Sequence, residues 1–212
     1  MRGLKTPRAF LTGFLGLLAA IGLSSCGNNS YFGRDTRNKM IVSVSDQKML
    51  LVSDGEPVKS YKISTSKFGT GDKPGSHRTP VGHLRVAKKI GNNAPQGTVF
   101  KSRRPTGEIL KPNSPGRDPI VTRIFWLKGL EDRNENSYGR TIYIHGTTEE
   151  NRLGRPASYG CIRMSSRDVV DLYNRVGHGA DVFIIRGPIR NGHYNSGQSA
   201  VSSNHNGGRN RG

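Results

Sequence analysis

Cysteine is scarce in this sequence. The 212 residues contain two, Cys26 and Cys161. Two cysteines that lie far apart exclude a small domain held together by several disulfides. The sequence also has no C-x-x-C pair and no H-E-x-x-H motif, which are strong patterns for thioredoxin-like redox chemistry and for zinc. We therefore expect neither a metal nor a cofactor, and each cysteine needs its own interpretation.

Acidic residues are also few. The chain has 15 Asp and Glu against 33 Lys and Arg, a net charge of +18. Such a charge attracts nucleic acid, but the sequence has no recognition helix and no aromatic-basic ribonucleoprotein motif. We expect no nucleic-acid partner. An exported chain would instead meet anionic envelope polymers and lipids, and a basic surface that only aids solubility is the alternative.

The longest apolar run, residues 9–23, is shorter than the roughly 20 residues of a membrane span. A basic segment without acids precedes it, as in a signal peptide. The run ends in Leu-Ser-Ser-Cys26, which resembles the lipobox of bacterial lipoproteins, whose cysteine is diacylated and becomes the first residue after cleavage. We predict a signal peptide over residues 1–26 and lipidation of Cys26. A plain secretory peptide or an uncleaved anchor is the alternative.

The composition along the chain predicts how it is divided into segments. Cleavage would remove three positive charges and leave +15. Residues 27–39 are polar and form a predicted tether. Residues 40–186 form a predicted folded domain, and residues 187–212, rich in Gly, Asn and Ser, form a predicted disordered tail. Two acyl chains anchor a protein stably. We predict an exported lipoprotein of the cell envelope, anchored to the membrane by its N-terminal lipid, on the periplasmic side in a Gram-negative organism.

Short β-prone runs alternate with turn residues in the body of the chain. The pattern predicts strands at residues 40–44, 48–52, 58–64, 83–87, 141–145 and 181–185. One helix is predicted to begin after Ser165 or Ser166 and to end before Gly177. Residues 91–119 are rich in Pro, Gly and Asn, which predicts a long excursion over the surface.

Two motifs carry the chemistry. His145-Gly146 ends one predicted strand, and Ser158-Tyr159-Gly160-Cys161-Ile162-Arg163 precedes the predicted helix. With Thr-Pro-Val-Gly upstream at residues 79–82, this order resembles the L,D-transpeptidase catalytic domain family, also called YkuD-like, over residues 40–186. The resemblance implies a mainly β fold, a single YkuD-like β-sandwich domain with one or two short helices.

The residue types fit nucleophilic catalysis. A thiol is mostly protonated at neutral pH, so Cys161 needs a base, and His145 can take its proton and later return it to a leaving amine. The backbone N–H groups of residues 159–161 can hold an oxyanion, and Gly160 permits a tight turn there. In the family, the carbonyl that would be that of Gly146 orients the histidine.

More than one role is open for several other residues in or near the motifs. Arg163 can bind a substrate carboxylate, help to hold the thiolate, or form a structural salt bridge. Ser158 can position the histidine or stabilise the turn. Tyr159 stands where many family members have a second histidine, and it can hydrogen-bond the substrate. His77 and His83 are candidates for lining the groove. Residues 69–75 lack the G-K-[ST] ending of a phosphate loop and are predicted to be a turn.

The resemblance implies peptidoglycan L,D-transpeptidation. Cys161 would form a thioester with a stem tetrapeptide, release D-Ala, and transfer the acyl group to an amine in cell-wall cross-linking. The amine would come from a neighbouring stem or from a protein lysine. Two alternatives are a carboxypeptidase or endopeptidase that uses water as the acceptor, and a non-catalytic wall-binding lipoprotein.

Overall fold

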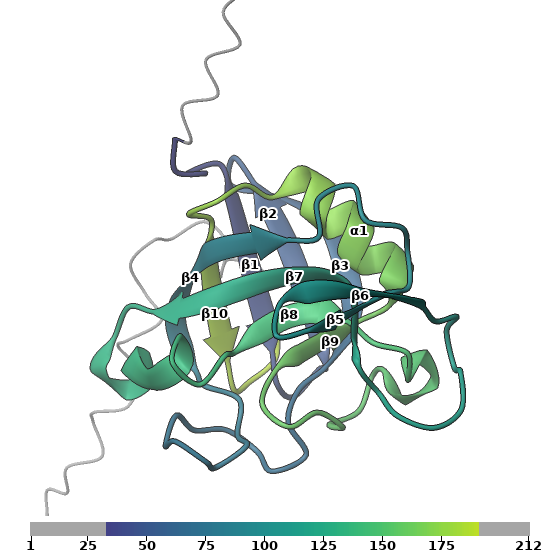
Figure 1. Cartoon of the computed structure of the whole chain (residues 1–212). Helices are drawn as coiled ribbons and strands as arrows, with labels where there is room; N and C mark the ends of the chain where they lie inside the picture. Colours follow the sequence, from purple (N-terminus) through teal and green to yellow (C-terminus); the bar gives the residue numbers. More distant parts are fainter. Residues whose placement is uncertain (1–32, 191–212) are drawn as a thin grey trace, which may run out of the picture. The chain divides into compact units, whose positions relative to one another are not determined.

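The computed structural model describes residues 33–190 and is built mainly from strands (Figure 1). Its elements are β1 (Asn38–Ser43), β2 (Lys48–Ser53), β3 (Glu56–Ser64), β4 (Gly82–Ile90), β5 (Thr98–Lys101), β6 (Arg104–Ile109), β7 (Ile120–Gly129), β8 (Tyr143–Gly146), β9 (Ile162–Met164) and β10 (Asp181–Ile185), with one α-helix, α1 (Ser166–Arg175), and two 3-10 helices, η1 (Asp132–Ser137) and η2 (Glu150–Arg152). The predicted signal peptide, Cys26, the first part of the tether and most of the tail lie outside the described residues.

The strands form one sheet that closes on itself. Their order is β4-β10-β1-β2-β3-β9-β8-β7-β5-β6, and β4 also pairs with β7. That extra pairing joins the two halves of the sheet into a barrel-like sandwich. Figure 1 shows β1, β2 and β10 behind β4 and β7. The mainly β fold with few helices is confirmed.

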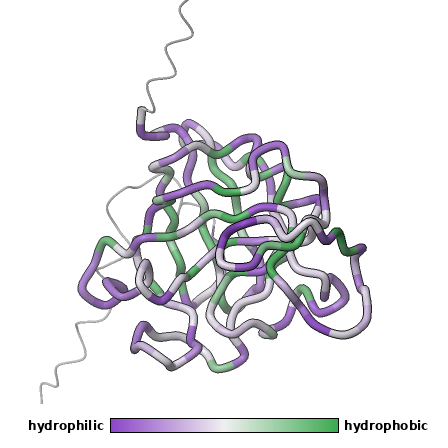
Figure 2. The backbone as a smooth tube through the Cα atoms, viewed as in Figure 1, coloured by the Kyte–Doolittle hydropathy of each residue, from purple (hydrophilic) through white to green (hydrophobic). Residues whose placement is uncertain are grey.

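The main core lies between the two halves of the sheet. Alternate residues of the strands point into it, as the two-residue period of a strand requires. Met40 and Val42 of β1, Phe125 and Leu127 of β7, and Ile144 of β8 belong to this cluster. Figure 2 shows the apolar stretches along the strands and the polar stretches in the connecting loops.

Helix α1 closes one side of the core. Ser165 caps it by accepting a hydrogen bond from Asp168 N at 3.0 Å, as predicted from the sequence. Its buried apolar residues, Val169, Leu172 and Tyr173, join the main core. Within residues 33–190, every helix falls short of the length and hydrophobicity that crossing a bilayer requires.

A second, smaller cluster lies on the opposite face of β7 and β8. Phe100, Ile124 and Tyr143 form it, and Trp126 and Cys161 pack against it. Ile124 and Tyr143 alternate along their strands with the core residues Phe125 and Ile144. Cys161 therefore lies on the outer face of this part of the sheet, away from the main core.

Two expectations need correction. Residues 91–119 are not an unbroken loop, because β5 and β6 pair as an antiparallel hairpin inside them. The motif that contains Cys161 precedes α1 as predicted, but the short strand β9 between Cys161 and the helix was not predicted. Residues 69–75 lie in the connection between β3 and β4 and contain a turn, as predicted.

Candidate active site

The pairing of β8 with β9 brings the two sequence motifs together. The strands are parallel, with Ile144 opposite Ile162 and His145 opposite Arg163. Both isoleucines point into the main core. Because neighbouring side chains in a strand point to opposite faces, His145 and Arg163 lie side by side on the outer face.

Cys161 shares that face, two residues before Arg163. Its Sγ accepts a hydrogen bond from the backbone N–H of Tyr143 at 3.4 Å. The thiol also donates to the carbonyl oxygen of Thr141 at 3.5 Å. Both partners belong to the residues that lead into His145. The nucleophile candidate is therefore held by β8 and the residues just before it, and β8 itself carries the base candidate.

His145 is buried, with 5% of its surface exposed. Its Nδ1 lies 2.8 Å from the carbonyl oxygen of Gly146. A carbonyl only accepts, so Nδ1 carries the proton and Nε2 is the basic nitrogen. Burial lowers the pKa of His145 to about 4, which keeps the imidazole neutral at pH 7.

The Gly146 position has no room for a side chain. A Cβ there would lie 2.6 Å from the carbonyl oxygen of Val121 and 3.2 Å from Val169 of α1. Only glycine lets β8 approach β7 and the helix this closely. The carbonyl that orients His145 is therefore fixed by tight packing on the core side of the strand.

The turn before Cys161 is held by side-chain hydrogen bonds. Ser158 Oγ donates to the carbonyl of Cys161 at 2.6 Å and accepts from the N–H of Gly160 at 3.2 Å. Thr79 Oγ1 donates to the carbonyl of Gly160 at 3.0 Å. Gly160 has φ +121°, a conformation that favours glycine. Of the two roles predicted for Ser158, these contacts favour stabilising the turn.

The same contacts bear on the predicted oxyanion donors. The N–H of Gly160 is already bonded to Ser158. The N–H groups of Tyr159 and Cys161 are the two other candidates. Such donors act when they point at the position the oxyanion will occupy.

A cavity of about 310 Å³ opens beside the thiol. Its lining residues are Gly75, His77, Arg140, Thr141, Ile142, Tyr159 and Cys161. Tyr159 is 56% exposed, and Lys67 Nζ donates to its hydroxyl at 2.9 Å. That hydrogen bond lowers the pKa of Tyr159. His77 thus lines the cavity, as the sequence suggested.

His83 lies elsewhere. It contacts Asp181 at 3.0 Å and stacks on Phe183 with 4.5 Å between the ring centroids. It is not one of the residues that line the cavity beside Cys161. Within residues 33–190, no group of three or more His, Cys, Asp or Glu side chains is arranged to hold a metal ion.

The thiol of Cys161 is neutral at pH 7. Burial raises its pKa, while the hydrogen bond from Tyr143 and the charges of Arg163 and Arg140 oppose that rise. A neutral thiol and a neutral imidazole on one face of the sheet are not a preformed ion pair. The reaction then requires proton transfer from Cys161 as the sulfur attacks.

Arg163 is engaged by two carboxylates. Its guanidinium contacts Asp118 at 2.8 Å and Glu149 at 2.9 Å, and its side chain is 10% exposed. Glu149 also pairs with Arg152 at 2.8 Å. These contacts favour the structural salt bridge among the three roles left open for Arg163, since a substrate carboxylate would compete with two carboxylates that already contact the guanidinium.

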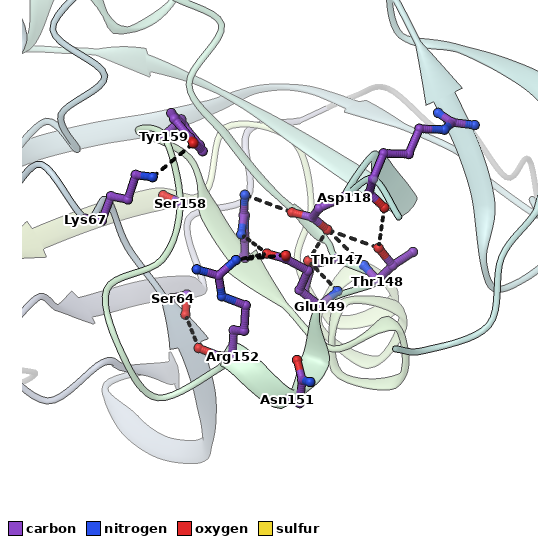
Figure 3. Close-up of polar contacts among 12 residues, drawn as sticks. Ser64, Lys67, Asp118, Thr147, Thr148, Glu149, Asn151, Arg152, Ser158 and Tyr159 are labelled. Carbon is purple, nitrogen blue, oxygen red and sulfur yellow. Dashed lines mark hydrogen bonds and ion pairs between the residues drawn. The ribbon is translucent and has the colours of Figure 1, made fainter. Parts of the chain in front are cut away.

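Asp118 is a residue that the sequence did not point to. It comes at the end of the excursion 91–119 and accepts hydrogen bonds from the hydroxyl of Thr147 and from the N–H and hydroxyl of Thr148 (Figure 3). Figure 3 also shows Glu149 with Arg152 beside this group. Asp118 thereby fixes the chain directly after His145 and Gly146. Asp118 is one of two acids in a segment rich in Pro and Gly, and it forms no sequence pattern that could reveal this role.

The family model described as "YkuD: L,D-transpeptidase catalytic domain" matches residues 37–184. The chain is 28% identical over 145 residues to "Putative L,D-transpeptidase YqjB" of Bacillus subtilis, and 26% identical over 145 residues to "Putative L,D-transpeptidase YkuD" of the same organism. Each match covers 68% of this chain, with 69% of YqjB and 64% of YkuD covered.

Solved structures of similar proteins also match. An L,D-transpeptidase from Mycobacterium tuberculosis H37Rv has 20% sequence identity and a TM-score of 0.46, over 71% of this chain and 58% of that chain. The L,D-transpeptidase of Xylanimonas cellulosilytica, residues 123–326, has 19% identity and a TM-score of 0.46, over 70% of this chain and 60% of that chain. The chain thus spans about three fifths of these two structures.

Proposed function

The chain belongs to the L,D-transpeptidase catalytic domain family, and from that premise we propose that it is a peptidoglycan L,D-transpeptidase with Cys161 as nucleophile and His145 as base. One observation carries the proposal. The β8–β9 pairing places the buried imidazole and the thiol on one face of the sheet, and the thiol lines an open cavity. Peptidoglycan peptides are the substrates that the family implies.

The first half-reaction forms a thioester. The sulfur of Cys161 attacks the carbonyl carbon of the third stem residue while its proton passes to Nε2 of His145. The C–N bond to the terminal D-Ala then breaks, and the imidazolium gives that proton to the leaving amine. The backbone N–H groups of Tyr159 and Cys161 stabilise the oxyanion between these two steps.

The geometry requires one movement before this transfer. The thiol hydrogen points to the carbonyl of Thr141 at 3.5 Å, so the Sγ–H bond must rotate toward His145. Hydrogen bonds of catalytic groups often align only when substrate is bound. The bond between Nδ1 and Gly146 keeps Nε2 free to accept the proton throughout.

The second half-reaction uses an amine. A primary amine of a neighbouring stem, or of a protein lysine, attacks the thioester carbon and forms a C–N bond. The C–S bond breaks, and the departing sulfur takes the proton that the amine loses. Water in place of the amine would give a carboxypeptidase, with a free tripeptide as product. Analysis of the products therefore identifies the acceptor, whereas the residues that form the thioester do not.

Product analysis on tetrapeptide muropeptides tests the proposal. Purified protein should release D-Ala, form a thioester adduct detectable by intact mass, and yield cross-linked dimers when an acceptor stem is added. Cys161→Ala and His145→Ala should abolish dimer formation. Cys26→Ser removes the other thiol and serves as the control that keeps activity. Full activity of Cys161→Ala would overturn the mechanism, and free tripeptide alone would replace transfer by hydrolysis.

We also propose that Cys26 is lipidated and anchors the enzyme to the cell envelope. The proposal is supported by the basic segment, the apolar run and the Leu-Ser-Ser-Cys ending in the sequence. Metabolic labelling with a fatty acid should mark the wild-type protein and not the Cys26→Ser variant, which should move from the membrane to the soluble fraction. Unchanged labelling of Cys26→Ser would contradict lipidation at this residue.

A further inference from the structure

His77 has an unusual backbone. Its φ is +55°, in the left-handed region that few residues other than glycine adopt. Ser66 holds it there by donating from Oγ to the carbonyl of His77 at 2.5 Å. Residues kept in rare conformations cluster at functional sites, where the surrounding structure supports the strain. The conformation of His77 is thus imposed by its neighbours.

The segment that carries His77 is clamped on both sides. Arg140 donates to the carbonyl of Arg78 at 2.7 Å, and a buried ion pair of 2.8 Å ties Arg140 to Asp72. Directly after it, Thr79 donates to the carbonyl of Gly160 in the turn before Cys161. Segment 72–79 is therefore fastened to the same turn that positions the thiol.

His77 lines the cavity that Cys161 lines. It meets Tyr159 edge to face, with ring centroids 5.8 Å apart, and Phe68 at 5.9 Å. The buried His145 is not among the residues that line this cavity. Among the lining residues, His77 is therefore the histidine that a molecule entering the cavity toward the sulfur meets first.

The other lining side chains with titratable groups are poorly suited to act as a base. The Arg140 guanidinium is a cation bonded to Asp72 and to backbone carbonyls. The hydroxyl of Tyr159 is bonded to the ammonium of Lys67. Cys161 itself carries the acyl group once the thioester has formed. Among the described lining residues, this leaves the imidazole of His77.

We propose that His77 is a second catalytic histidine, which serves the acceptor amine in the second half-reaction. The proposal rests on the proposed thioester mechanism. The lone pair of a neutral primary amine attacks the thioester carbon, and the surplus proton on its nitrogen passes to an imidazole nitrogen of His77. The C–S bond then breaks, and the departing thiolate takes that proton from His77, so both histidines end neutral.

Each histidine acts in a different half-reaction. His145 serves the thiol and the leaving D-Ala, and His77 serves the incoming amine. Loss of the His77 imidazole should leave thioester formation intact and slow only transfer. A residue that merely shapes the cavity would slow both steps together.

The test is His77→Asn, because asparagine tolerates the left-handed backbone and lacks a basic nitrogen. We expect the pre-steady-state burst of D-Ala to stay within about twofold of wild type while dimer formation falls about 100-fold, so that the thioester accumulates in intact-mass spectra. Added free imidazole should restore transfer. If His77→Asn lowers the melting temperature, His77→Gly serves as the second variant, because glycine also fits this backbone.

His83→Gln is the matched control, since it removes a histidine outside the cavity and should leave both half-reactions unchanged. Wild-type transfer by His77→Asn would overturn the proposal, and so would a joint loss of burst and transfer without rescue by imidazole. A wild-type protein that forms no thioester would instead refute the proposed function itself. The two failures are therefore distinguishable.

Discussion

Arg163 and Asp118 form an ion pair of 2.8 Å in which each side chain is only 10% exposed. The pair joins the strand that follows Cys161 to the end of the excursion 91–119. Asp118 also binds the two threonines that follow Gly146. The two chain segments that carry the catalytic candidates are therefore fastened to a single carboxylate.

Asp118→Ala should destabilise the fold. The substitution leaves the buried Arg163 with Glu149 alone, and removing one partner of a buried pair costs about 3–5 kcal/mol. The free energy of unfolding, measured by urea denaturation, should fall by about 3–5 kcal/mol. Glu108→Ala is the control, because the Glu108–Arg117 pair is exposed and such pairs contribute at most about 1 kcal/mol. Equal losses in the two variants would contradict the role of Asp118.

The reactivity of Cys161 should depend steeply on pH. Burial raises the pKa of its thiol, so little thiolate exists at pH 7 in the free enzyme. The rate of alkylation by iodoacetamide, followed in Cys26→Ser to remove the other thiol, should increase about tenfold per pH unit up to at least about pH 8.5. A rate that levels off near neutral pH would mean a preformed thiolate and would contradict the neutral pair.

His145 should make the fold less stable in acid. Burial lowers its pKa from 6.5 to about 4, so between these values the unfolded chain binds a proton that the folded chain does not. The contribution of neutral His145 to the free energy of unfolding is fully present above pH 6.5 and is lost as the pH falls toward 4. The shift corresponds to about 3 kcal/mol at most.

Urea denaturation at pH 7 and pH 4 measures this loss. His145→Gln keeps a neutral side chain at the position and should show a smaller fall in unfolding free energy over the same interval. The comparison cancels the carboxylates that titrate in both proteins. Parallel pH profiles for the two proteins would show that His145 is not buried in its neutral form.

The strands with clear alternation were predictable from the sequence. The predicted runs at 40–44, 48–52 and 181–185 correspond to β1, β2 and β10, because one face of each packs on the main core. β7 was missed, since both of its faces are covered and its apolar residues do not alternate with polar ones. β6 was missed because it contains Pro105 and Gly107, and β5 was missed because it has only four residues and follows a segment rich in Gly, Asn and Pro.

The candidate site was predictable only where residues stand close in sequence. Motif order pointed to His145 and Cys161, and the strand pairing explains why they share a face. Asp118 lies 27 residues before His145, and no periodicity links the two. Arg163 shows the same limit, because its partners depend on how the excursion 91–119 folds back onto β9.

Gly146→Ala should damage stability and activity together. A Cβ at this position would come within 2.6 Å of the Val121 carbonyl, a backbone atom that cannot move aside easily. Overpacking of this kind costs about 1–3 kcal/mol. It would also displace the carbonyl that holds Nδ1 of His145, so thioester formation should slow even in the folded fraction. Melting temperature and the D-Ala burst measure the two effects.

Gly139→Ala is the matched control for Gly146→Ala. The nearest heavy atom to a Cβ at Gly139 is the carbonyl oxygen of Asn136 at 3.7 Å, which is an ordinary contact. Its stability and burst should stay close to wild type. If Gly146→Ala formed the thioester at the rate of Gly139→Ala, the carbonyl of Gly146 would not be needed to orient His145. A slow burst at full stability would instead assign the whole effect to the orientation of the imidazole.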